Sequence, residues 1–253
     1  MNLEKVTQDG KSSWDANQSK WPQPNIPWVM KQTWQDILFA HYPIEQKLLR
    51  PLVPDTLQLD LYNGLGWIGV VSLYVKNNRL RGLPKVPGID QFPQLNVRTY
   101  VTLNGKPGVY FLSIDAPNIL AVMLAKTFYR LPFYNADILI QYAHSEVHFK
   151  SIRRKSDIQY NCSYYAASEF FHPKPGSFDE WIAERYSLYS LGKSGQPFRC
   201  DILHEPWSLK HADAEFGDNT LLSNQGIRIE SHQPILHFAK KKDVRLWPVI
   251  SVR

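Results

Sequence analysis

The sequence predicts a mainly β protein of the α+β class, built as one antiparallel barrel or one strongly curved sheet. Aromatic residues make up 13% of the chain, and there are 18 prolines. Aromatic and β-branched residues favour strands, and proline favours turns. Short alternating segments follow one another as strand, turn and strand, with only two or three helices between them. That order argues against a doubly wound parallel sheet.

The domain organisation follows from length and composition. The 253 residues are 43% hydrophobic and 21% charged, which is typical of a globular protein. We expect residues 1–27 to form a polar N-terminal arm, because Pro22, Pro24 and Pro27 oppose regular structure. Residues 28–253 are expected to form a single domain. Tryptophans in and beside the arm offer apolar surface that can pack back onto the body.

The first globular elements run from Trp34 onward. Trp34–His41 is typical of a strand, and Glu45–Leu49 of a short helix that Pro51 stops. Gly66–Val75 is apolar, β-branched and aromatic, which predicts a strand. Lys76–Gln91 contains two glycines and two prolines, so it is predicted to be a long loop.

A hairpin is predicted next, and its first strand alternates clearly. One face of Leu95–Leu103 carries the apolar side chains of Leu95, Val97, Val101 and Leu103. The other face carries Asn96, Arg98, Tyr100 and Thr102. Asn104-Gly105 and Pro107-Gly108 are expected to form the turn, and Val109–Ile114 the returning strand.

A helix is predicted over Asn118–Arg130, with Asp115 as its N-cap and Pro132 ending it. A second short helix is expected at Phe178–Tyr186. The remaining predicted strands are Asp137–Tyr142, Glu146–Ile152, Ile158–Tyr165, Phe198–His204 and Ile235–Lys240.

Charge, cysteine content and hydropathy limit the function classes. The net charge is +6, which raises the question of nucleic acid or anionic ligands without answering it. Cys162 and Cys200 are the only cysteines, so one chain cannot supply a four-cysteine zinc site. The N-terminus has no apolar signal core, and Ile119–Ala125 is far shorter than the ~20 residues of a membrane helix. We therefore expect a soluble, cytoplasmic protein without a membrane partner.

Known catalytic and metal motifs are incomplete. His144, Glu146 and His148 lie on one predicted strand face, where residues four apart are about 13 Å apart, so both imidazoles could easily share one ion only if the segment were helical. No metal site is expected. Gly192-Lys193-Ser194 lacks the rest of a phosphate loop, and no GxSxG motif occurs. The basic residues around 150–155 and 240–245 are interpreted as solvated turns, so nucleic acid is not an expected partner.

Two single residues raise chemical questions. Lys126 lies on the predicted helix one turn before Arg130, and a neighbouring cation can lower a lysine pKa enough for nucleophilic chemistry. A solvent-facing pair is the commoner outcome. Arg98 lies in mid-strand, and if its face lines a barrel interior it needs a carboxylate or an anionic ligand. If that face is solvated, it needs no partner.

An ordered series of motifs resembles the YqjF-like family of uncharacterised bacterial proteins. The signature segment is Gln91–Val101, QFPQLNVRTYV. The other matching segments are Leu38–Pro43, Leu48–Pro54, Gly82–Pro84, Gly105–Phe111, Leu131–Tyr134 and Asp243–Pro248. That family resembles acetoacetate decarboxylase in fold. The resemblance implies an antiparallel, cone-like β-barrel around a buried pocket, with a few flanking helices.

The resemblance also shows where the decarboxylase chemistry is missing. The decarboxylase carries its Schiff-base lysine directly after a proline, followed by a second lysine. The matching positions here hold Phe133 and Tyr134 after Pro132. Phenylalanine cannot form an imine, so Schiff-base decarboxylation is not expected. Gln94 stands where the family motif leads us to expect a glutamate, and an amide cannot act as a general base.

The sequence thus predicts a small-molecule pocket, for a ligand of the carboxylic or keto acid kind, with no cofactor. The residues expected to line or flank it are Gln94, Arg98, Tyr100, Tyr110, Phe133 and Tyr134. An enzyme that uses acid–base chemistry without a Schiff base is the alternative, with His41, Tyr134 and Lys126 as candidates. A nucleic-acid or protein-interaction module is the third interpretation. Because the superfamily forms homo-oligomers, the resemblance allows for one here.

Overall fold

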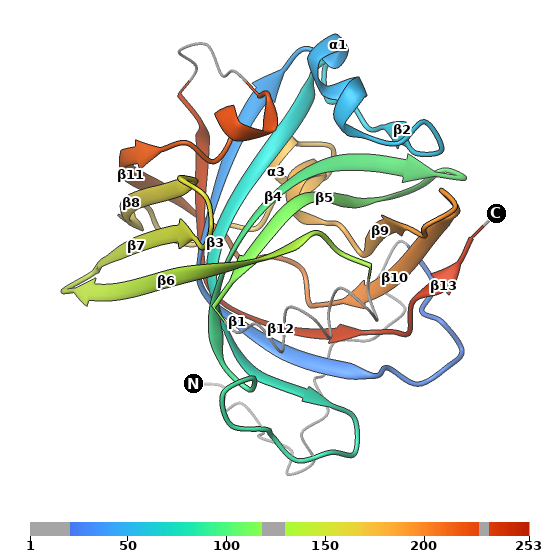
Figure 1. Cartoon of the computed structure of the whole chain (residues 1–253), viewed down its shortest axis with the longest axis horizontal. Coiled ribbons are helices and arrows are strands. Elements are labelled where there is room, and N and C mark those ends of the chain that lie inside the picture. Colours follow the sequence, from blue (N-terminus) through green and yellow to red (C-terminus); the bar gives the residue numbers. More distant parts are fainter. Residues whose placement is uncertain (1–20, 118–129, 228–232, 253) are drawn as a thin grey trace, which may run out of the picture.

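The computed structural model describes residues 21–117, 130–227 and 233–252, and strands dominate it (Figure 1). The predicted helix at Asn118–Arg130 lies outside the described residues, except for Arg130 itself. None of the described helices is long and apolar enough to cross a membrane.

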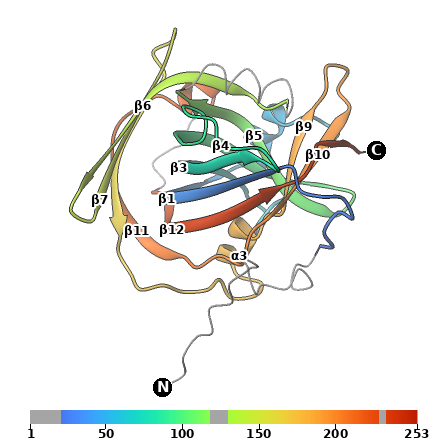
Figure 2. The same ribbon diagram turned by 90° about the horizontal axis from the view of Figure 1, so that it is seen from below.

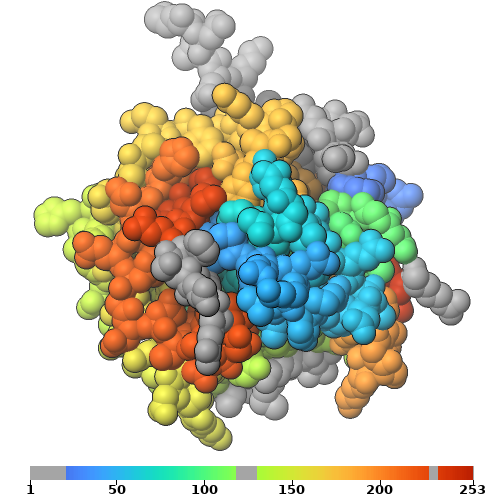
Figure 3. Space-filling model, turned by 90° about the horizontal axis from the view of Figure 1, so that it is seen from above, coloured from blue at the N-terminus to red at the C-terminus, as the bar shows by residue number. Residues whose placement is uncertain are grey.

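The described strands are β1 (Met30–Ile44), β2 (Gln58–Leu59), β3 (Gly66–Leu80), β4 (Phe92–Leu103), β5 (Lys106–Ala116), β6 (Phe133–Ala143), β7 (Glu146–Arg153), β8 (Gln159–Ala166), β9 (Ser187–Leu191), β10 (Pro197–Leu203), β11 (Lys210–Asn219), β12 (Ile235–Leu246) and β13 (Ile250–Ser251). The described helices are α1 (Gln46–Leu49), η2 (Arg50–Leu52), α3 (Phe178–Ala183) and η3 (Ser223–Gln225). Seen from above, the segment that contains α1 and η2 covers the centre of one end of the molecule, in blue (Figure 3).

The strands close into two rings that share one wall. The larger ring runs through β1, β3, β4, β5, β6, β7, β8, β11 and β12 and returns to β1. The smaller ring leaves it at β5, passes through β9 and β10, and rejoins it at β12. Strands β12, β1, β3, β4 and β5 form the shared wall. Figure 2 shows β6, β7 and β11 on one side of this wall and β9 and β10 on the other.

The shared wall is buried on both faces, which explains its long apolar runs. Ile37 and Phe39 of β1 belong to the core cluster that includes residues of β9 and β10, so they face the smaller ring. Leu38 and Ala40 belong to the cluster that includes residues of β7 and β8, so they face the larger ring. Alternation along one strand therefore fills two separate cores.

The barrel-like fold class and all the predicted strands among the described residues are confirmed. The sheet is mixed rather than purely antiparallel, because β5 pairs in parallel with both β6 and β9. Strands β9 and β11 and the two-residue strands β2 and β13 were not predicted from the sequence. Strand β11 reads KHADAEFGDN and is largely exposed, so it lacks the apolar signal by which the other strands were found.

Three local predictions around the hairpin and its neighbours are wrong. Strand β3 continues to Leu80, so the first part of the predicted 76–91 loop is strand. Pro107 and Gly108 lie inside β5, and the turn is confined to Asn104-Gly105, both of which have positive φ. Asp115 is not an N-cap, because it lies in β5 and forms a buried ion pair with Arg153, at 2.7 Å.

Part of the predicted arm lies against the body. The Trp247 indole donates a hydrogen bond to the Ile26 carbonyl, at 2.7 Å, and the Val29 amide donates to the Leu246 carbonyl, at 2.8 Å. Trp21 lies over the Lys106 ammonium, which is 5.9 Å from its ring centre. The described residues of the arm, 21–27, therefore pack against the domain.

Candidate functional site

A polar stripe on β4 lines the smaller ring. It consists of the even-numbered residues Gln94, Asn96, Arg98 and Tyr100. Tyr100 belongs to the core cluster of the smaller ring, whereas Leu95 and Val97 belong to that of the larger ring. Arg98 belongs to this alternating pattern and therefore lies on an interior face. The sequence alone allowed either an interior or a solvated position for it.

His41 and Tyr100 meet at the centre of this face. The Nε2 atom of His41 lies 2.5 Å from the Tyr100 hydroxyl, and both residues are fully buried. Gly69 on the intervening strand leaves the room for this contact. A Cβ atom there would lie 3.3 Å from His41 Nε2 and 3.3 Å from the Tyr100 hydroxyl. The hydroxyl donates to the imidazole or accepts from it, depending on the tautomer.

The His41 imidazole is held neutral. Burial lowers its pKa well below the usual value, and the positive charges of Arg98 and Arg185 and the nearby His237 lower it further. Its Nδ1 atom has no hydrogen-bond partner among the described residues. A neutral imidazole in contact with a phenol can exchange a proton with it, so this pair has the components of acid–base chemistry.

Arg98 lies beside the pair without a carboxylate partner. Its guanidinium is 5.5 Å from the Phe39 ring centre and 5.9 Å from that of Tyr100. Its Nε atom is buried and unbonded, and no described carboxylate forms an ion pair with it. The residue nevertheless keeps partial exposure, while Val97 and Thr99 on either side of it are buried. Part of the Arg98 side chain is therefore accessible, although the strand residues on either side of it are not.

Arg185 is a second buried guanidinium in the same region, and it is paired. It donates to the Asp60 carboxylate at 2.5 Å and to the Trp181 carbonyl at 2.5 Å. Its guanidinium also lies 5.0 Å from the Tyr100 ring centre. The helix predicted over Phe178–Tyr186 would have carried both Trp181 and Arg185, but α3 ends at Ala183, so Arg185 lies just beyond it. The sequence offered no signal for Asp60, which lies 125 positions from Arg185.

Helix α3 covers the pair with aromatic side chains and anchors to β12. Phe178 contacts His41 edge-on, with ring centres 6.2 Å apart, and Trp181 packs on Tyr100 at 4.7 Å. In the first turn of the helix, the Asp179 carboxylate lies 3.1 Å from His237 Nε2. His237 is 1% exposed, and sequence analysis did not single it out. The interior is thus apolar in its walls and polar only at a few points, as ligand sites are.

The other predicted site residues are distributed more widely. Gln94 is on the Arg98 face, but four strand positions separate their Cα atoms by about 13 Å. Phe133 packs against the core cluster of the smaller ring. Tyr110 packs against the cluster of the larger ring, on the opposite face of the wall from Arg98. Lys126 lies outside the described residues.

Tyr134 lies with Arg153 rather than with the His41–Tyr100 pair. The Arg153 guanidinium is 3.9 Å from its ring centre, and Tyr134 is 40% exposed. Asn96, which sequence analysis placed on the polar face but did not select, is 4% exposed. Its Oδ1 atom has no partner among the described residues, so it joins the candidate site.

Several basic residues of the two basic clusters are already neutralised or buried. Arg153 pairs with Asp115, Arg154 pairs with Asp137, and Lys240 pairs with Asp36. Lys242 is 8% exposed, and burial lowers its pKa. These contacts leave fewer free cations than the sequence suggested. Within the described ranges, no group of three or more His, Cys, Asp or Glu side chains is arranged to hold a metal ion.

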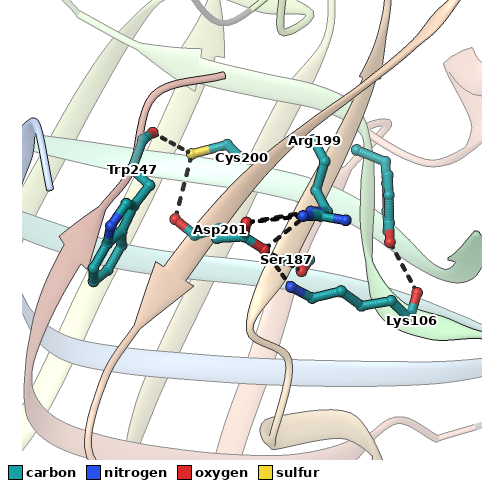
Figure 4. Close-up of polar contacts among 7 residues, drawn as sticks. Lys106, Ser187, Arg199, Cys200, Asp201 and Trp247 are labelled. Atoms are coloured by element: carbon teal, nitrogen blue, oxygen red, sulfur yellow. Dashed lines mark hydrogen bonds and ion pairs between the residues drawn. The ribbon is translucent and has the colours of Figure 1, made fainter. Parts of the chain in front are cut away.

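A second polar cluster joins β5, β9 and β10, and its groups are paired (Figure 4). The Asp201 carboxylate accepts from Lys106 at 2.6 Å, from Ser187 at 3.1 Å and from Arg199 at 3.1 to 3.3 Å. The adjacent Cys200 thiol donates to the Trp247 carbonyl, and burial raises its pKa to about 12. This cluster is typical of structural ion pairs, in contrast to the unpaired Arg98.

Comparison with known proteins assigns the fold to the acetoacetate decarboxylase-like class. The structure is similar to acetoacetate decarboxylase from Legionella pneumophila subsp. pneumophila str. Philadelphia 1, with a TM-score of 0.60, 13% identity, and 96% and 98% of the two chains covered. It is also similar to the enduracididine biosynthesis enzyme MppR complexed with pyruvate, with a TM-score of 0.60, 10% identity, and 92% and 93% coverage.

The DUF2071 family model, described as an uncharacterized conserved protein, matches residues 31–243. The chain is 43% identical over 228 residues to the uncharacterized protein YqjF of Bacillus subtilis (strain 168), covering 89% of this chain and 93% of that protein. The chain therefore belongs to the DUF2071 family, and the predicted family resemblance is confirmed.

Proposed function

We propose that the smaller ring binds a small carboxylic or keto acid, with Arg98 holding its carboxylate. The observation that carries this proposal is the unpaired guanidinium of Arg98 between Phe39 and Tyr100. Removing a cation from water without a partner is costly, and an anionic ligand offsets that cost. Arginine also offers a carboxylate two parallel donors, which fixes its orientation.

The surroundings of Arg98 fit a small acid with a carbonyl group. Asn96 and the His41–Tyr100 pair supply polar atoms on the same interior face. Phe39, Phe178 and Trp181 supply apolar walls. One protein of similar fold, the MppR enzyme, was solved with pyruvate, a keto acid of this class. We do not propose an imine, because Phe133 occupies the position that the resemblance assigns to the nucleophilic lysine.

Calorimetric titration with pyruvate and acetoacetate tests the binding function. We expect Arg98→Gln to weaken binding at least tenfold, or about 1.4 kcal/mol. Arg154→Gln is the matched control, because Arg154 is an exposed arginine paired with Asp137, and it should leave affinity unchanged. Unchanged affinity in Arg98→Gln, or no binding of either acid by the wild type, contradicts the proposal. Borohydride treatment with pyruvate should leave the protein mass unchanged.

A second candidate function is acid–base catalysis on the same acid. It is favoured by the 2.5 Å contact between His41 and Tyr100 and by the lowered His41 pKa, which keeps a proton acceptor available at neutral pH. The simplest reaction of this kind is removal of a proton from the carbon beside the keto group.

Exchange of the pyruvate methyl protons in D2O, followed by proton NMR, measures that reaction. Loss of a positioned general base lowers rates by roughly 10² to 10⁴. His41→Gln should therefore slow exchange within that range while pyruvate affinity stays within about threefold. Equal exchange rates for wild type and variant would leave simple binding as the function.

A further inference from the structure

Strand β5 changes partner halfway along its outer edge. Val109 and Tyr110 pair with β9, whereas Ile114–Ala116 pairs with β6. Between these stretches the pairing of β5 with β4 skips Leu112, which is therefore bulged. The two rings separate at this point, and neither β6 nor β9 pairs with the bulged segment.

A cavity of about 440 Å³ lies in this fork. We call it the fork cavity. Its described lining residues are Leu52, Tyr110, Phe111, Leu112, Arg130, Leu131, Pro132, Tyr189, Ser190, Leu191 and Gln225. The volume is within the range of roughly 300 to 1,000 Å³ that is usual for small-molecule sites. Most of the lining is aliphatic or aromatic, so the body of a ligand held here would be apolar.

Two polar groups in the lining have no protein partner. Ser190 is 3% exposed, and its hydroxyl bonds to no described residue. Such a buried hydroxyl is normally satisfied, so a ligand oxygen that reaches Ser190 would meet a hydrogen-bonding group with no competing partner among the described residues. The Arg130 guanidinium forms no ion pair with any described carboxylate, and it stacks on Phe198 with 4.5 Å to the ring centre. Arg130 itself lines the cavity, which places a positively charged side chain at its edge.

The aromatic rings indicate the shape of the ligand. Tyr189 is 1% exposed, and its hydroxyl donates to the Lys106 carbonyl at 2.9 Å, so its ring is fixed in the wall of the cavity. Tyr110 is half-buried on the same core cluster. Flat rings favour stacked or edge-on aromatic partners over flexible chains.

We propose that the fork cavity binds an aromatic carboxylic acid of one or two rings. Its carboxylate accepts hydrogen bonds from Arg130, the Ser190 hydroxyl donates to a ligand oxygen, and its rings pack against Tyr110 and Tyr189. This site does not depend on the function proposed for Arg98. Tyr110 and Arg98 face opposite sides of the shared wall.

Calorimetric titration with 2-naphthoate tests the fork cavity. The wild type should bind it, and Arg130→Gln should weaken binding about tenfold. Arg130 is exposed, so this variant should fold, and its thermal midpoint checks that it does. Ser190→Ala should weaken binding by about threefold. Arg98→Gln is the matched control and should leave 2-naphthoate affinity unchanged.

The neutral analogue 2-naphthylmethanol separates charge from shape. Its affinity should be the same for the wild type and Arg130→Gln, because it presents no carboxylate to the guanidinium. The proposal is overturned if 2-naphthoate does not bind the wild type or binds Arg130→Gln equally well. It is also overturned if Arg98→Gln abolishes 2-naphthoate binding, which would place the ligand in the smaller ring. If Arg98→Gln weakens pyruvate binding and Arg130→Gln does not, pyruvate and 2-naphthoate bind at different sites, and each proposal stands or fails by its own variant.

Discussion

Three buried histidines should make this fold sensitive to mild acid. Burial is the largest cause that lowers the pKa of His41, His204 and His237, and His41 is lowered most clearly. Free histidine in an unfolded chain has a pKa of about 6.5. Below that pH the unfolded state binds protons that the folded state does not. Stability should therefore be fully present above pH 6.5 and fall as the pH drops toward the lower folded values.

The magnitude follows from proton linkage. Each histidine that is protonated only in the unfolded state contributes about 1.4 kcal/mol per pH unit below 6.5. His41 alone should cost about 1.4 kcal/mol between pH 7.5 and 5.5, and the three together up to about 4 kcal/mol. A small domain has a total stability of about 5–15 kcal/mol, so the loss is measurable. Burial raises the pKa of Asp115, so this carboxyl has the opposite effect on stability. As the pH falls toward the pKa of the unfolded chain, the folded state takes up this proton first, and the free energy of unfolding rises.

Urea unfolding at pH 7.5 and 5.5 measures this dependence. His41→Gln removes one titrating group, so its loss of unfolding free energy between the two pH values should be about 1.4 kcal/mol smaller than that of the wild type. His144→Gln is the matched control, because His144 is exposed in the turn between β6 and β7. Identical pH dependence in the wild type and His41→Gln would refute the reasoning that burial keeps His41 neutral.

Three further results are expected from unfolding experiments. Asp201→Asn should cost about 3 kcal/mol, because it leaves the mostly buried Lys106 and Arg199 without their shared carboxylate. Asp137→Asn should cost less than about 1 kcal/mol of unfolding free energy, because its ion pair with Arg154 is exposed. If Asp201→Asn and Asp137→Asn lose the same unfolding free energy, burial does not determine the strength of these ion pairs. Gly69→Ala should cost about 1–3 kcal/mol of unfolding free energy, because the added methyl group crowds His41 and Tyr100. An unchanged thermal midpoint would mean that these two side chains can move apart without cost.

The sequence predicted the strands whose burial pattern is regular. Leu95–Leu103 alternates because one face packs against the largely apolar core of the larger ring and the other carries the polar stripe, and such a period of two can be read from the local sequence. Gly66–Val75 was found because a strand buried on both faces reads as a continuous apolar run. The family motifs then supplied the barrel class, which periodicity alone left open between a barrel and a curved sheet.

The two-ring closure could not be predicted in the same way. It depends on β10 pairing with β12 and on β5 pairing in parallel with β9, and these contacts join segments far apart in the chain. The pairing of Arg185 with Asp60 depends on the same closure. The local sequence does not specify which distant strand will lie alongside, so the contact between His41 and Tyr100 and the surroundings of Arg98 could be found only from the structure.

The asymmetry of the shared wall is the best structural argument for where function lies. Towards the larger ring, β1 and β4 bury mainly apolar side chains, among them Leu38, Ala40, Leu95 and Val97, and the one carboxylate buried there in β1, that of Asp36, is paired with Lys240. Towards the smaller ring, the same strands carry ionisable or charged groups that are costly to bury. Arg185 is paired with Asp60, but no described carboxylate pairs with Arg98. A fold stabilised by packing alone would replace such a group with a hydrocarbon, and the unpaired Arg98 guanidinium is therefore the observation on which the proposal of an anion site rests.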